Sequence, residues 1–100
     1  LKDAKLLEEL GCFCIILEKI PAVLAQKVAT SVSVPVIGIG AGSMVDGQVL
    51  VTHDMMGITK DFQPRFLRRY LELFDEMKDA TKRYINDVKT GDFPNNQEQY

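Results

Sequence analysis

The sequence contains little that would direct the protein to nucleic acid or to a membrane. Its 12 basic and 14 acidic residues give a net charge of −2, and no basic run forms an electrostatic footprint for nucleic acid. No apolar stretch approaches the roughly 20 residues of a membrane span, and no signal-peptide pattern is present. These absences make a cytoplasmic location the expectation, with neither nucleic acid nor a membrane as partner.

Cysteine and histidine are also scarce, with two Cys and one His in the chain. Cys12 and Cys14 are close in sequence, but no second cysteine pair or nearby histidine completes a zinc site. We therefore expect both cysteines to be reduced core residues. The chain also lacks an initiator methionine. Leu1 lies inside a helical pattern, which indicates a fragment of a longer protein.

The residues that are present predict one small α/β domain. Hydrophobic residues make up 46% and charged residues 26%, which is typical of a globular chain. Short apolar runs predict strands over 12–17, 34–39 and 48–52, the last in competition with a short amphipathic helix. Helical spacing and helix-start prolines predict helices over 1–10, 21–31, 64–74 and 75–89, with an irregular tail over 92–100. Alternating helices and strands favour a parallel sheet.

Polar or glycine-rich residues follow each predicted strand. Glu18 ends the first, Gly40 and Gly42 end the second, and His53 with Asp54 ends the third. Because ligands of parallel α/β sheets bind beyond the carboxyl ends of the strands, these residues predict one shared site.

Each of these residues has two interpretations. Glu18 follows an apolar run that would desolvate its carboxylate and raise its pKa into the range of a general base, or it is a surface acid paired with Lys19. The glycines allow close approach of a ligand to the backbone, or they only allow neighbouring side chains to pack closely. His53 is a catalytic group, or a cap or packing group beside Asp54.

The remaining polar groups have milder interpretations. Asp46 with Gly47 is a turn signal, and Asp54 is expected to cap the turn that follows it. A cationic face is either solvated or meets the anionic tail of a substrate; it consists of Lys60, Arg65, Arg68 and Arg69. The core is expected to contain the aromatic residues together with Met44, Met55 and Met56.

Several motifs together resemble the ketopantoate hydroxymethyltransferases. They are Leu17-Glu-Lys-Ile-Pro21, Pro35-Val-Ile-Gly-Ile-Gly-Ala-Gly42, Asp46-Gly-Gln-Val-Leu-Val51, His53-Asp54 and the stretch from Tyr84 to Pro94. The resemblance runs from about Ala4 to Pro94.

The resemblance implies the C-terminal part of a (β/α)8 barrel, about strands six to eight with their helices. It implies transfer of a hydroxymethyl group from 5,10-methylenetetrahydrofolate to the 2-oxo acid 3-methyl-2-oxobutanoate, an early step of pantothenate biosynthesis. By position, Glu18 resembles the family's catalytic glutamate. Gly40, Gly42 and His53 are candidates for binding the oxo acid or the folate. The Mg²⁺ of the family would be held by residues outside this chain, and the full-length enzyme would be a homo-oligomer.

Two departures from the family pattern bear on these expectations. Lys19 stands where an uncharged residue is more usual, next to Glu18. The first five strands of the barrel are absent, so we expect the chain to be inactive by itself. The alternative hypothesis is a small non-catalytic α/β module that binds an anion or assembles with a partner chain.

Overall fold

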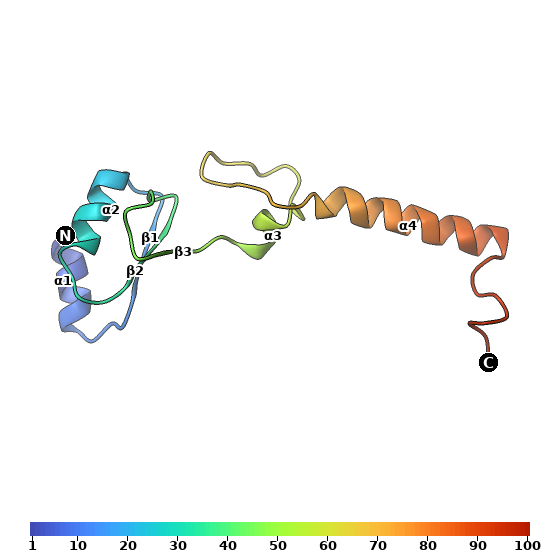
Figure 1. Cartoon of the computed structure of the whole chain (residues 1–100), viewed down its shortest axis with the longest axis horizontal. Helices are drawn as coiled ribbons and strands as arrows, with labels where there is room; N and C mark the ends of the chain where they lie inside the picture. The colour runs from blue at the N-terminus through green and yellow to red at the C-terminus, as the bar shows by residue number, and fades with distance from the viewer.

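The computed structural model describes all 100 residues. It contains a three-stranded parallel sheet and four helices, which come before, between and after the strands in the sequence (Figure 1). The elements are α1 (Lys2–Glu9), β1 (Ile15–Glu18), α2 (Ala22–Ala29), β2 (Val36–Ile39), β3 (Gly47–Gln48), α3 (Thr52–Met55) and α4 (Leu73–Thr90). The prediction of an α/β fold with a parallel sheet is therefore confirmed.

The strands lie in the order β1-β2-β3, each parallel to the next. In the first pair Ile15 lies opposite Val36 and Glu18 opposite Ile39. In the second pair Gly38 lies opposite Gln48. The carboxyl ends of all three strands therefore lie along one edge of the sheet.

The core lies on one face of the sheet, against α1 and α2. Its buried residues are Ala4, Ile15, Val28 and Val36. Side chains alternate along β1, so Ile15 and Leu17 pack on this core, whereas Ile16 and Glu18 are exposed on the opposite face. The sequence predicted a first strand buried on both faces. That prediction is wrong for this chain because helices cover only one face.

The ends of the first helices agree with the sequence signals. Gly11, which adopts φ +90°, directly follows Leu10, the C-cap of α1, and Pro21 directly precedes the first residue of α2. The Ser33 N–H and hydroxyl both donate to the Glu8 carboxylate, at 2.6 and 2.5 Å. These hydrogen bonds hold the pKa of Glu8 below its ordinary value and join α1 to the segment that enters β2.

The third strand is much shorter than predicted. β3 contains only Gly47 and Gln48, and the last pairing bond is donated by the Val49 N–H to the Gly38 carbonyl. Beyond this point β2 turns away at Gly40, whose φ is +62°, so the following residues have no strand to pair with. The chain forms α3 instead, but only from Thr52 onward, so the competing prediction of a short helix over 48–52 is also wrong for most of that segment.

The helix predicted over 64–74 is absent. Only one turn forms there, with the Leu67 N–H donating to the Pro64 carbonyl. The N–H groups of Tyr70, Leu73 and Phe74 donate to the carbonyls of 55, 56 and 57, at 2.8 to 3.0 Å. These hydrogen bonds between distant parts of the chain replace helical hydrogen bonds and connect the loop to the end of α3.

The last helix is longer than predicted and stands apart from the sheet (Figure 1). α4 has no buried residue, and the molecule measures 66 × 30 × 16 Å. The expectation that Met44, Met55, Met56 and the aromatic residues form the core is wrong for several of them: Met44, Phe13 and Tyr84 are exposed, and Met55 and Met56 are only half-buried. Gly91 ends α4 at φ +76°, and Phe93 packs edge-on against Tyr84 with ring centroids 5.5 Å apart.

Two further observations complete the fold. Residues 92–100 contain neither helix nor strand. None of the helices combines the length and apolar character needed to cross a membrane.

Candidate functional site at the strand ends

The carboxyl ends of β1 and β2 are joined by backbone pairing up to the last residue. The Lys19 N–H donates to the Ile39 carbonyl at 2.8 Å, one residue beyond Glu18. This bond sets Glu18 beside the start of the glycine turn at 40–42. Two of the groups predicted to share a site therefore lie on neighbouring strand ends.

Glu18 is exposed on the face of the sheet that no helix covers. The sequence predicted that apolar neighbours would desolvate its carboxylate. The residues of this chain do not provide that environment, because the apolar side chains before it alternate between the two faces. Glu18 forms no ion pair with Lys19, so the alternative of a neutralised surface pair is not observed either.

Lys19 has an unusual backbone conformation. Its φ of +52° makes it the one residue other than glycine with a positive φ. A lysine in this region costs of order 1–3 kcal/mol, and such residues persist where the surrounding structure imposes the conformation. Here the imposed turn leads from the strand end to Pro21 and α2. The departure at Lys19 noted in the sequence thus coincides with the sharpest change of direction next to Glu18.

The glycine turn is packed by side chains of the chain itself. A Cβ on Gly40 would lie 3.0 Å from the Phe66 ring, and a Cβ on Gly42 would lie 2.5 Å from the Cβ of Ala22. Both glycines also line a cleft, and Gly42 is exposed. Close packing is therefore observed at both glycines, and the backbone of the turn also borders a cleft.

Two polar side chains hold this turn in place. The Gln48 side-chain amide donates to the Gly42 carbonyl at 2.8 Å. The Val36 N–H donates to the Asp46 carboxylate at 2.8 Å, and the Asp46 N–H donates to the Val36 carbonyl. Asp46 lies in a bend, but Gly47 already belongs to β3, so the predicted Asp46-Gly47 turn is not observed and Asp46 instead joins the entry of β3 to the start of β2. Sequence reasoning missed the role of Gln48, for which its place immediately after Asp46-Gly47 was the only signal.

The histidine does not lie at a strand end. His53 is on α3 with its side chain exposed, and it does not line the clefts beside the glycine turn. Asp54 is only 8% exposed, yet its carboxylate forms no hydrogen bond to His53 or to the following turn. The strand-end placement and the capping role predicted for this pair are therefore wrong, because the segment is helical.

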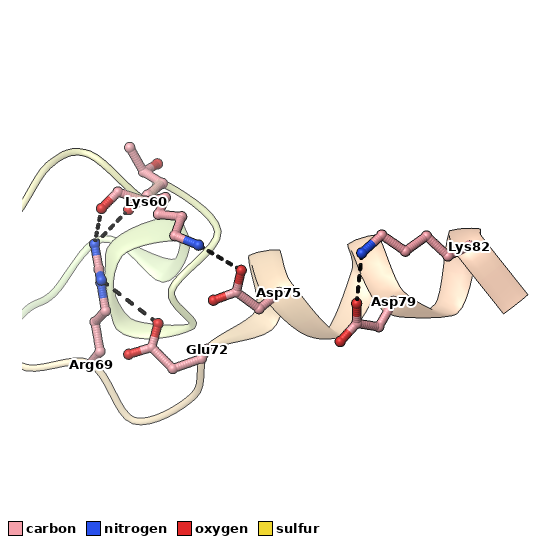
Figure 2. A network of polar contacts seen from close by, with 7 residues as sticks. Lys60, Arg69, Glu72, Asp75, Asp79 and Lys82 are labelled. Carbon is pink, nitrogen blue, oxygen red and sulfur yellow. Dashed lines mark hydrogen bonds and ion pairs between the residues drawn. The ribbon is translucent and has the colours of Figure 1, made fainter.

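The loop before α4 is held by an arginine (Figure 2). The Arg69 guanidinium donates to the carbonyls of Thr59, Lys60 and Phe62, and its side chain is only 12% exposed. Arg69 therefore does not belong to a solvated cationic face, which was one of the two interpretations of the sequence. Its role is to close the loop.

Lys60 belongs to the same network. Its ammonium donates to Asp75 at 2.6 Å and lies 5.2 Å from the centre of the Phe74 ring. The hydrogen bond raises the pKa of Lys60 and lowers that of Asp75. This contact joins the loop to the first turn of α4.

No group of three histidine, cysteine, aspartate or glutamate side chains is arranged to hold a metal ion.

A parallel α/β sheet with an acid and a glycine turn on adjacent strand ends defines a class of proteins that bind small molecules at that edge. The family model of ketopantoate hydroxymethyltransferase matches residues 1–96. The chain belongs to this family.

Curated relatives agree with the assignment. The chain is 67% identical over 100 residues to a 3-methyl-2-oxobutanoate hydroxymethyltransferase of Porphyromonas gingivalis. The corresponding proteins of Flavobacterium johnsoniae and Bacteroides thetaiotaomicron are 63% and 61% identical. Each alignment covers 100% of this chain and 37% of the relative, so the chain spans a little over a third of their length.

Proposed function

We propose that this chain is part of an enzyme that transfers a hydroxymethyl group from 5,10-methylenetetrahydrofolate to 3-methyl-2-oxobutanoate, giving 2-dehydropantoate for pantothenate synthesis. The observation that carries the proposal is the position of Glu18, at a strand end beside the glycine turn, in a chain of this family. The names of the relatives support the hydroxymethyl group and 3-methyl-2-oxobutanoate as parts of this reaction.

In this proposal β1, β2 and β3 are strands six, seven and eight of a (β/α)8 barrel. The parallel order and the helices on one face support it, since barrel helices lie outside the strands. The open face that carries Ile16 and Glu18 is then the barrel interior. Catalytic residues of such barrels stand at the carboxyl ends of strands, where Glu18 is found.

Glu18 serves as the general base in this reaction. Its carboxylate takes the proton from C3 of the oxo acid, and the electron pair of that C–H bond forms an enolate. Water adds to the methylene carbon of the folate as both of its C–N bonds break; this gives formaldehyde and tetrahydrofolate, whose N5 and N10 take the two protons of the water. C3 of the enolate then bonds to the formaldehyde carbon, and the protonated Glu18 returns its proton to the oxygen, which becomes the hydroxyl group of the product.

The rest of the barrel completes the environment of Glu18. Side chains from opposite strands fill the interior of a closed barrel and exclude water from it. A carboxylate placed there is desolvated, which favours the neutral acid and makes the carboxylate a stronger base. The magnesium ion of the family would be held by residues in that part of the protein, where it would stabilise the negative charge of the enolate.

Replacing Glu18 by glutamine in the full-length protein tests the proposal. Glu18→Gln keeps the size of the side chain but removes the base, so we expect turnover to fall by roughly 10²–10⁴-fold. Exchange of the C3 proton of the oxo acid with deuterium, followed by NMR without folate, should slow to a similar extent. Glu9→Gln, on α1, is the matched control and should leave both rates unchanged. An unaltered exchange rate in Glu18→Gln would exclude the assigned role.

A further inference from the structure

A large cleft lies next to the glycine turn, between the strand ends and the loop that precedes α4. Its volume is about 680 Å³. One wall contains Ile39, Gly40 and Gln48 from the strand ends; the other contains Phe66, Arg68 and Tyr70 from the loop. Clefts of roughly 300–1,000 Å³ are typical of sites for organic ligands of drug size.

The loop contributes the aromatic surface of the cleft. Phe66 is half-buried and packs on Gly40, and Tyr70 is 68% exposed. Flat rings of this kind pack against planar ligands in stacked or edge-on arrangements. The cleft therefore offers aromatic surface next to the strand ends.

The loop also contributes a free cation. Arg68 lines the cleft and forms no hydrogen bond or ion pair with the rest of the chain. The guanidinium of its neighbour Arg69 donates hydrogen bonds to three carbonyls, and the Lys60 ammonium donates one to Asp75. Arg65 is also unpaired, but it does not line the cleft. Arg68 is thus the cation placed to meet an anionic ligand there.

We propose that Arg68 binds the carboxylates of the glutamyl tail of the folate, with the aromatic part of the folate beside Tyr70. The inference rests on the proposed function, because it assigns a binding residue to the co-substrate of that reaction. A folate combines planar rings with a tail of carboxylates, which matches aromatic surface followed by a guanidinium. Guanidinium groups bind carboxylates through two parallel hydrogen bonds.

The other substrate fits this cleft less well. The five-carbon oxo acid has one carboxylate and no aromatic surface, and it is small for a cleft of about 680 Å³. A role of Arg68 in binding the oxo acid predicts a change in KM for that substrate. A role in binding the folate tail predicts a dependence on the number of glutamates.

The test compares Arg68→Gln with the matched control Arg65→Gln in the full-length protein. Calorimetry gives the Kd for tetrahydrofolate carrying one or three glutamates. Because Arg68 is exposed, we expect Arg68→Gln to raise the Kd by about 3–10-fold for the triglutamate and by less for the monoglutamate. Added salt should reduce the difference from the wild type, and the KM for the oxo acid should not change. Arg65→Gln should bind both folates normally.

Three results would overturn the inference: an unchanged Kd in Arg68→Gln, a loss independent of tail length, or an equal loss in Arg65→Gln. Binding does not require the base at position 18. The calorimetric result is therefore independent of the proton-exchange test of Glu18, and failure of one proposal is distinguishable from failure of the other.

Discussion

At the scale of single residues, packing decides what the glycines do. Gly42 and Gly91 have similar backbone conformations, with φ of +82° and +76°. They differ in surroundings, because a Cβ at Gly42 would meet Ala22, whereas nothing lies within 4 Å of a Cβ at Gly91. The pair therefore separates the cost of backbone strain from the cost of a clash.

Replacing each of these glycines by alanine should show this difference. We expect Gly91→Ala to lower the free energy of unfolding by about 1 kcal/mol through strain alone. Gly42→Ala should lower it by about 2–4 kcal/mol, because overpacking adds to the strain. Urea unfolding of the full-length variants measures both values. Equal losses at the two positions would mean that Ala22 yields without cost.

At the scale of elements, the loop before α4 is held by polar contacts and has little core of its own. Leu67 is the only buried hydrophobic residue between α3 and α4. The Arg69 guanidinium instead donates hydrogen bonds to three carbonyls, and the Glu72 carboxylate lies 3.7 Å from it (Figure 2). This loop also carries Phe66, Arg68 and Tyr70, so Arg69 maintains the wall of the proposed folate cleft.

Removing the guanidinium should open this loop locally. Hydrogen bonds from charged groups contribute about 1.5–3 kcal/mol. We therefore expect Arg69→Ala to reduce hydrogen-exchange protection of the Tyr70, Leu73 and Phe74 amides by about 10–100-fold. Lys82→Ala removes an exposed ion pair with Asp79 and serves as the control, with no change expected. Full protection in Arg69→Ala would show that the backbone bonds to 55–57 are sufficient.

At the scale of the whole molecule, two apolar surfaces lack a partner within the chain. β1 pairs only with β2, which leaves its other edge unpaired, and Ile16 is 63% exposed on the open face. α4 exposes a stripe formed by Phe74, Met77, Tyr84, Ile85 and Val88. An unpaired apolar strand edge pairs readily with another chain.

We expect the isolated 100-residue chain to self-associate for this reason. Sedimentation at increasing concentrations should show species larger than a monomer. Hydrogen exchange should show weak protection of the amides of 12–17 at low concentration. A single monomer boundary with strong protection across 12–17 would contradict the expectation, and it would mean that this chain is a self-contained domain.

The sequence was most informative where local chemistry decides the structure. The apolar run before Glu18 and the β-branched run before Gly40 each formed a strand, because a short buried strand needs little more than such a run and a stop. Gly11 and Gly91 ended their helices, since glycine adopts a positive φ without a steric cost. The motifs from Leu17 to Asp54 were sufficient to indicate the family.

Long-range contacts decided the rest. Residues 64–72 have a helical pattern of apolar residues, but bonds from Arg69 and from three amides to distant carbonyls hold them as a loop. His53 does not lie at a strand end, because β2 turns at Gly40 and β3 therefore has no partner strand beyond Gln48. By itself the sequence determined the parallel α/β unit, the adjacent strand ends and the family. Only the tertiary structure decided which side chains border the cleft, because the cleft joins residues 39–50 to residues 66–70, which are about 16 to 31 residues apart and which no local pattern connects.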